Sequence, residues 1–188
     1  TPAYLRQSEK SLHGLQIWVA LPKAIEQMEP EFYHADADEL PTWNTNGVQF
    51  KLIAGEAFGR KSPVPVFSPL YFVELKAEAA TTLNIGEYLF GESGIYILEG
   101  AIENDGNVFG TKQLLVAKDS SLCSFTMQAN TTIYIFGGDA FPEERFIYWN
   151  FVATSKELIE EAKTKWLNQE FKSVPGETEF VPLPERRL

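Results

Sequence analysis

The chain has 188 residues, of which 44% are hydrophobic and 13% aromatic, and this composition predicts a folded domain with a sizeable core and excludes a disordered chain. Its formal net charge of −10 argues against direct binding of nucleic acid, because phosphate groups are neutralised by clustered Lys and Arg. No apolar run approaches the roughly 18 residues of a membrane-spanning helix, so we expect neither membrane insertion nor a signal peptide at the printed start.

The single cysteine, Cys123, excludes an internal disulfide and a cysteine-based metal cluster. Its neighbours Leu122 and Phe125 are apolar, and no histidine close in sequence would stabilise a thiolate. We therefore predict a buried structural thiol, in a protein of the reducing cytoplasmic compartment.

Alternating apolar residues from Leu15 to Leu21 predict a first strand, which ends at Pro22. Residues 23–47 are acidic and aromatic without a regular period, and we expect them to lie across a packed surface. From Val48 onward, strand-sized runs recur at spacings of roughly 8–12 residues, which predicts an all-β sandwich or barrel rather than an α/β fold. The predicted strands cover residues 48–54, 64–67, 70–75, 79–83, 94–98, 101–103, 113–117, 123–128 and 131–136.

One α-helix is predicted at residues 155–171, where Thr154 and Glu157 have the spacing of a capping box. Its apolar stripe consists of Leu158, Ile159, Ala162 and Trp166, with Glu160, Glu161, Lys163 and Lys165 facing solvent. Glu161 and Lys165 are spaced for an i,i+4 ion pair. The tail at residues 173–188 contains three prolines and is expected to be extended and docked.

The stretch LNIGEYLFGESGIYILEG at residues 83–100 resembles the first half of a cupin jelly-roll barrel, with an extended run, a glycine-bearing turn and a buried strand. In an active cupin this region carries two histidines and a glutamate that hold a metal. The corresponding positions here are Glu87, Leu89 and Glu92 or Ser93, and residues 121–125, where a second cupin motif would place a histidine, contain none.

Three segments resemble the pirins, a family of two-barrel cupins. They are LHGLQIWVALP at residues 12–22, RFIYWNFVATSKELIEEAKTKW at 145–166 and VPGETEFVPLP at 174–184. Because these segments occur in the family's order over nearly the whole chain, the chain is identified as a pirin-like protein with a cupin-type jelly-roll barrel and a C-terminal helix.

The resemblance implies two tandem barrels, of which the N-terminal one holds an iron through three histidines and a glutamate and the C-terminal one holds no metal. In pirins the last two ligands form a His-x-Glu shortly before the LHGLQ-type strand. No histidine precedes His13 here, and Glu9 is the only carboxylate there. The chain is thus expected to comprise the end of the N-terminal cupin with the bridge between barrels (1–47), the C-terminal cupin (48–152), and the helix with its tail (153–188), and to carry no catalytic, cofactor-binding or metal-ligating residue.

The two histidines are too few for a cupin iron site. His13 is interpreted as a strand-end residue bonded to backbone, with the role of an outer-shell partner of an upstream iron site as the alternative. His34 is expected at the surface, where adventitious metal binding with Asp36 and Asp38 is the alternative. Iron is expected only in the preceding cupin.

Other candidate groups favour structural roles. The carboxylate pairs Glu143-Glu144 and Glu160-Glu161 are interpreted as solvated faces, and Ser120-Ser121 as a turn without a nearby base. Gly137-Gly138-Asp139 lacks the spacing of a nucleotide-binding loop and is predicted to be a turn. A barrel mouth for a small aromatic ligand could be lined by six aromatic residues, half of them expected in the core: Tyr71, Tyr88, Tyr96, Phe125, Tyr134 and Phe136.

Two functions follow from the resemblance. In the first, the whole protein is an iron-dependent quercetin 2,3-dioxygenase, and this chain is its metal-free companion barrel, inactive alone. In the second, the chain is a protein-interaction module for a transcription factor or metabolic enzyme, which docks through its acidic, aromatic surface (residues 23–47 and the face near 139–150). An unpaired first strand also predicts either a homodimer or a strand folded back onto the barrel.

Overall fold

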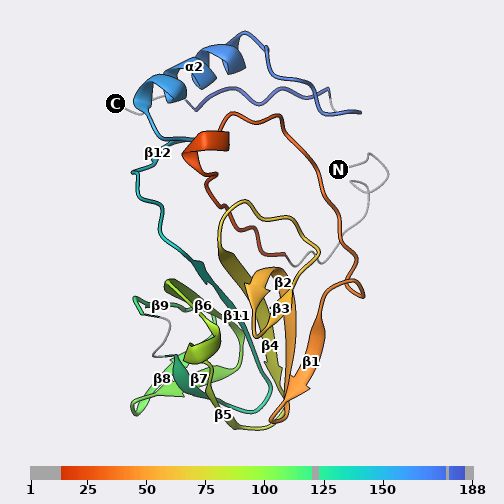
Figure 1. The fold of residues 1–188 in the computed structure, drawn as a ribbon, viewed down its shortest axis with the longest axis vertical. Coiled ribbons are helices and arrows are strands. Elements are labelled where there is room, and N and C mark those ends of the chain that lie inside the picture. Colours follow the sequence, from red (N-terminus) through yellow and green to blue (C-terminus); the bar gives the residue numbers. More distant parts are fainter. Residues whose placement is uncertain (1–13, 120–122, 177, 185–188) are drawn as a thin grey trace.

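The computed structural model describes residues 14–119, 123–176 and 178–184, and these residues form two packed antiparallel sheets with one helix beyond them (Figure 1). The large sheet has the order β1 (Thr42–Thr45), β2 (Val48–Ala57), β4 (Leu70–Ala77), β11 (Thr131–Gly138), β6 (Glu92–Glu99) and β9 (Leu114–Ala117), and β3 (Arg60–Lys61) pairs with β2. The small sheet has the order β5 (Thr81–Asn84), β10 (Ser124–Met127), β7 (Ala101–Asn104) and β8 (Asn107–Gly110). The predicted all-β class is confirmed.

The core lies between the two sheets, because alternate residues of each strand point inward. From the large sheet it receives Leu52, Val73, Ile97 and Ile133, and from the small sheet Ile102 and Met127, all of them essentially inaccessible to solvent. Fully burying one such side chain contributes roughly 1.5–3 kcal/mol relative to leaving it exposed. Apolar residues therefore alternate with more exposed ones along these strands, because one face of each sheet packs against the other sheet.

Strand β2 changes direction at a bulge. Its register against β4 shifts between Leu52 and Ala54, and Gly55 has a φ of +76°. A Cβ at Gly55 would lie 1.8 Å from the carbonyl oxygen of Leu70, so only glycine permits this close approach. The bend turns the β2–β3 hairpin back, and the Phe58 ring comes to 5.2 Å from the Phe50 ring, centroid to centroid.

The remaining elements lie beyond the sandwich. A short 3-10 helix, η1 (Lys23–Ile25), lies between the sandwich and helix α2 (Lys156–Leu167) in Figure 1, and a second, η2 (Gly86–Tyr88), precedes β6. A two-stranded hairpin, β12 (Phe146–Tyr148) and β13 (Phe151–Ala153), leads into α2. Neither η1, η2 nor α2 is long and apolar enough to cross a membrane.

Long-range contacts join the N-terminal segment to residues on either side of α2. The Glu26 carboxylate accepts hydrogen bonds from the backbone N–H of Thr154 at 2.8 Å and from its hydroxyl at 2.6 Å. Lys172 forms an ion pair with Glu29 at 2.5 Å. The segment that precedes β1 therefore crosses a packed surface, as expected for residues 23–47, although residues 42–45 of that range form β1.

Two predicted strands are wrong. Residues 15–21 form no strand, because within the described residues no neighbouring strand pairs with them; Leu12 and His13 lie outside the described residues. Residues 64–67 also form no strand, because Pro63 and Pro65 lack the N–H groups that a ladder requires. The strands β1, β3, β8, β12 and β13 were not predicted.

Helix α2 is shorter than predicted and has a different cap. Ser155 is the N-cap, and its hydroxyl accepts the Leu158 N–H at 3.3 Å, because Thr154 is engaged by Glu26. The ion pair that the helix forms joins Lys163 to Glu160 at 2.6 Å, instead of Lys165 to Glu161, and it holds the Lys163 side chain near the Tyr148 ring rather than in solvent. The predicted apolar stripe is confirmed, with Ile159 buried.

Candidate functional site

The sandwich interior holds a small buried polar cluster, which includes Ser93, one of the positions that the cupin resemblance assigns to metal ligands. Ser93 on β6, Cys123 just before β10 and Tyr71 on β4 are each at most 5% exposed. The hydroxyls of Tyr71 and Ser93 lie 2.5 Å apart, and the Tyr71 hydroxyl also donates to the Phe90 carbonyl oxygen at 3.1 Å. Burial raises the pKa of the Cys123 thiol, which hydrogen-bonds with Ser93, so the predicted inert, structural thiol agrees with its surroundings.

This donor set does not suit a cupin iron. Ferrous cupin sites use neutral imidazoles and a carboxylate, whereas the cluster offers two hydroxyls and a thiol whose pKa is raised. Of the other aligned positions, Glu87 and Glu92 are exposed and Leu89 is buried apolar. Across residues 14–119, 123–176 and 178–184, no three His, Cys, Asp or Glu side chains come close enough together to hold a metal.

A second feature is a pocket of about 270 Å³ where the edge strands β1 and β5 of the two sheets face each other. We call it the β1–β5 pocket. Its wall is an aromatic cluster, in which Trp43 stacks on Phe50 at 5.2 Å and Phe58 stacks on Tyr88 at 5.1 Å, centroid to centroid. The complete lining is Trp43, Thr45, Asn46, Phe50, Phe58, Arg60, Leu83, Asn84, Ile85 and Tyr88.

Sequence reasoning identified only Tyr88 of this aromatic wall. Trp43 lies in the segment expected to be irregular, and Phe58 lies in the turn that follows the β2 bulge. The signal that could have indicated Phe58 is the turn Phe58-Gly59-Arg60, since Phe58 and Gly59 both adopt positive φ.

The six aromatic residues proposed for a barrel mouth do not line one cavity. Tyr71 and Phe125 are core residues, although Tyr71 also lines the groove that contains Phe136, and Tyr88 lines the β1–β5 pocket. Tyr134 donates a hydrogen bond to the Glu74 carboxylate at 2.8 Å, and burial together with that carboxylate raises the pKa of Tyr134 to about 12. Tyr96 is its cross-strand partner on β6, on a face opposite to the core.

The last of the six, Phe136, lines an apolar groove of about 580 Å³. One side of this groove consists of residues 17–21, and the other comes from residues 64–72 of the sandwich and from the end of β11. Arg145 fixes the N-terminal side, because its Nη2 donates to the Leu21 carbonyl oxygen at 3.1 Å. Of the two alternatives predicted for this segment, a homodimer or a strand folded onto the barrel, the structure has residues 17–21 beside the sandwich but without strand pairing.

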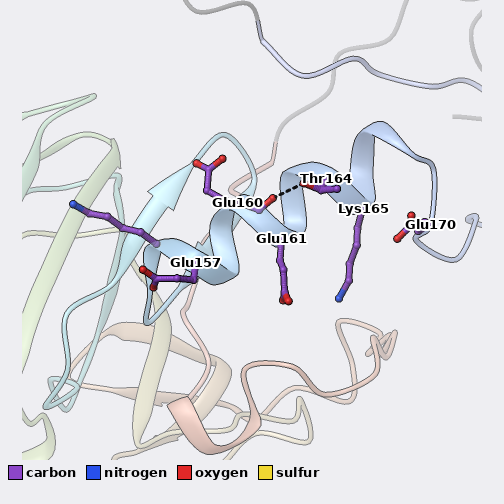
Figure 2. Close-up of a pocket in the computed structure, with 7 residues that line it drawn as sticks. Glu157, Glu160, Glu161, Thr164, Lys165 and Glu170 are labelled. Carbon is purple, nitrogen blue, oxygen red and sulfur yellow. Dashed lines mark hydrogen bonds between the residues drawn. The ribbon is translucent and has the colours of Figure 1, made fainter.

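The other sequence candidates stay separate. His34 is exposed and contacts Asp36 at 3.0 Å, and Asp38 makes no contact with it; His13, Ser120 and Ser121 lie outside the described residues. Gly137 and Gly138 are the last residues of β11, paired with β4 and β6, rather than a turn. The charged face of α2 has an open depression of about 550 Å³, into which Glu157, Glu161 and Lys165 project in Figure 2. It is a solvated helix face, as predicted for Glu160 and Glu161.

Comparison with known proteins identifies the fold family. Residues 70–172 match the profile of the pirin C-terminal cupin domain. A pirin-like protein of Caulobacter vibrioides is 40% identical over 185 residues, which are 96% of this chain and 63% of that relative. The chain therefore spans less than two thirds of the length of this relative.

Two crystal structures of quercetin 2,3-dioxygenase from Acinetobacter baumannii have similar folds. One superimposes with a TM-score of 0.77 at 28% identity, covering 91% of this chain and 58% of the other. The second has a TM-score of 0.69 at 27% identity, covering 83% and 56%. With a family profile matched over more than half of its residues and a cupin jelly roll shared with these structures, the chain belongs to the pirin family.

Proposed function

We propose that this chain supplies the metal-free companion barrel of a pirin-type protein with quercetin 2,3-dioxygenase-like activity. In this proposal residues 48–152 are the C-terminal cupin, residues 1–47 connect it to an iron-holding cupin, and residues 153–188 are an appended helix and tail. The observation that supports the proposal is the Tyr71–Ser93–Cys123 cluster, which is buried in the sandwich and contains no imidazole and no carboxylate.

The companion role has a physical basis in the groove formed with residues 17–21. Trp18 is 56% exposed there, and Val19 and Phe67 also present apolar surface. A neighbouring barrel that covered these side chains would remove apolar area from water, at about 25 cal/mol for each Å². The proposed contribution of this chain to the dioxygenase is thus stabilisation of the iron-holding barrel, without a catalytic group of its own.

The test is metal content and activity measured side by side. The chain and the full-length Caulobacter relative are purified, loaded with Fe(II) without oxygen, desalted and analysed for iron, and quercetin consumption is then followed in air. We expect stoichiometric iron and turnover only in the longer protein. Stoichiometric iron in the chain, or turnover above the free-iron background, would overturn the proposal, and His34 would then be the first residue to substitute.

A second candidate function is protein docking through residues 29–39, and one observation favours it. Phe32 is 88% exposed, beside Tyr33 and among Glu29, Glu31 and Asp36. An exposed aromatic residue in an acidic segment suits a partner with a basic, apolar surface. A purified transcription factor or metabolic enzyme captured by the chain should lose binding to Phe32→Ala and keep it with Val108→Ala, a change at another exposed apolar residue, on β8. Equal binding by both variants would exclude this surface.

A further inference from the structure

We infer that the β1–β5 pocket binds a small planar aromatic carboxylate. The inference is independent of the proposed function, because the pocket is built from this chain's own residues and contains no iron ligand and no member of the interior cluster. Four observations carry it: an aromatic wall held in place from behind, an arginine without a carboxylate partner, two amides that are exposed to solvent, and a volume that suits one ring or two fused rings.

The rings of the aromatic wall pack on one another, and Tyr88 keeps exposed ring surface at the pocket. Phe50 is buried and backs Trp43, with interplanar angle 14° and centroids 5.2 Å apart. Phe58 stacks on Tyr88 at 27° and 5.1 Å, and Tyr88 remains 47% exposed. Rings positioned in this way offer offset or edge contacts to a further ring, each worth more than its buried area alone. The wall therefore favours a planar aromatic ligand over an aliphatic one.

Arg60 supplies the positive charge. Its guanidinium lies 4.3 Å from the Trp43 centroid, and Nη1 donates to the Phe58 carbonyl oxygen at 3.1 Å. A guanidinium has five N–H donors, so these contacts orient the group and leave most of its donors available. No carboxylate of the described residues forms an ion pair with it, whereas the adjacent Lys61 is paired with Glu56 at 2.6 Å.

Arg60 is the one charged residue of the pocket lining, and the Glu87 carboxylate, which hydrogen-bonds with Tyr88, stays outside the lining. The net charge is −10, yet the lining contains one arginine and no carboxylate. An oriented guanidinium matches the two oxygens of a carboxylate in a bidentate arrangement. The ligand is therefore an anion, and its carboxylate lies at Arg60 while its ring lies against Tyr88 and Phe58.

The polar side chains and the volume define the rest of the ligand. Asn46 and Asn84 line the pocket and are exposed to solvent, so their side-chain amides are accessible to a ligand. They suit a ring hydroxyl, which can donate and accept. At about 270 Å³ the pocket is just below the range of roughly 300–1,000 Å³ that holds drug-sized ligands, so the ligand has one ring or two fused rings with short substituents.

The experiment is a titration of the chain, in buffer containing EDTA, with three probes of similar size. They are 4-hydroxybenzoate, the uncharged 4-hydroxybenzamide, and the non-aromatic cyclohexanecarboxylate. We expect 4-hydroxybenzoate to bind at least about tenfold more tightly than either control, because only it satisfies both the arginine and the rings. Amide chemical-shift changes should cluster at residues 43–46, 58–60 and 84–88.

Variants test the assignment. Arg60→Gln should weaken binding about tenfold or more, while Lys61→Gln removes the same charge one residue away and should leave affinity unchanged. Tyr88→Ala, at an exposed position, should weaken binding without loss of fold, as checked by circular dichroism. Three outcomes would overturn the inference: no saturable binding of 4-hydroxybenzoate, equal affinity in Arg60→Gln, or shift changes confined to other residues.

Discussion

Tyr71 is one of the largest fully buried side chains of the described core. Its position requires that residue 137, which lies against it, has no side chain. A Cβ at Gly137 would lie 2.4 Å from the Tyr71 hydroxyl oxygen and 2.3 Å from the Glu92 carbonyl oxygen. The second contact is with backbone, which cannot move without disturbing the β11–β6 ladder. Gly137 therefore belongs to the packing of the interior cluster.

Gly137→Ala should lower the free energy of unfolding by roughly 1–3 kcal/mol, as overpacked core substitutions do. The matched control is Gly110→Ala on β8, where an added Cβ meets no atom within 4 Å. Urea unfolding of both variants measures the difference. Equal midpoints for the two variants would show that the interior has room for the methyl group.

Tyr134 gives the stability a dependence on alkaline pH. Burial and the Glu74 carboxylate raise its pKa from 10.0 to about 12. Above pH 10 the unfolded chain therefore loses the phenolic proton while the folded chain retains it, so the unfolded state binds fewer protons and stability falls as pH rises toward 12. Below pH 10 this contribution is fully present.

Tyr134→Phe should remove one late-titrating tyrosinate from the near-ultraviolet absorbance curve and make the loss of stability between pH 10 and 12 less steep. Tyr96→Phe, the cross-strand neighbour, is the control, because it removes a phenol without removing the hydrogen bond to Glu74. If both variants keep the late titration, another tyrosine produces it.

At the level of elements, helix α2 depends on a residue far from it in sequence. Glu26 accepts two hydrogen bonds from Thr154, immediately before the N-cap Ser155. A carboxylate at this end also interacts favourably with the helix dipole. The N-terminal segment thus completes the capping of a helix that the local sequence only partly caps.

Glu26→Gln should lower the free energy of unfolding by about 1–2 kcal/mol, because a charge-assisted pair of hydrogen bonds becomes a neutral one. Amide exchange at Thr154 and Leu158 should accelerate, while exchange in β4 and β11 stays slow. Glu144→Gln removes the same charge from an exposed loop and serves as control; acceleration in that variant as well would indicate a general charge effect.

Strand prediction succeeded where the two-layer packing imposes alternation, as in β2, β4, β6 and β11. It failed where the presence of a partner strand, rather than the residue pattern, decides whether a segment forms a strand. Residues 15–21 alternate well but meet no partner strand among the described residues, and β12 and β13 are too short for their period to be read. The Thr154 cap was wrong because Glu26, remote in sequence, engages that hydroxyl.

The β1–β5 pocket could not have been predicted as a unit. Its aromatic wall combines Trp43, Phe58 and Tyr88 from three separate stretches, and the β2 bulge between Leu52 and Ala54 precedes the turn that carries Phe58. The absence of histidines at the cupin positions could be read directly from the sequence. Predicting which side chains fill that interior instead would have needed the pairing register of β4 with β11 and of β11 with β6, which the sequence pattern does not give.

At the level of the whole molecule, the apolar side chains of residues 17–19 remain partly exposed although they share a groove with the sandwich. Exposed contiguous apolar surface favours self-association. We expect sedimentation velocity of a dilution series to show a monomer–dimer equilibrium, which Trp18→Glu shifts to monomer while Val108→Glu does not. A single monomeric species at every concentration would show that the groove suffices to cover this segment.

The contacts of the N-terminal segment also bear on the order of folding during synthesis, because their partners are translated much later. Thr154 lies 128 residues after Glu26, Arg145 lies 124 after Leu21, and Lys172 lies 143 after Glu29. Contacts of such separation form late, because the loop they close must be ordered first. On the ribosome the sandwich strands emerge and can pair while the segment before β1 still lacks its partners. We therefore expect the docking of residues 21–29 onto residues 145–172 to be a late step, completed only after the sandwich strands have emerged.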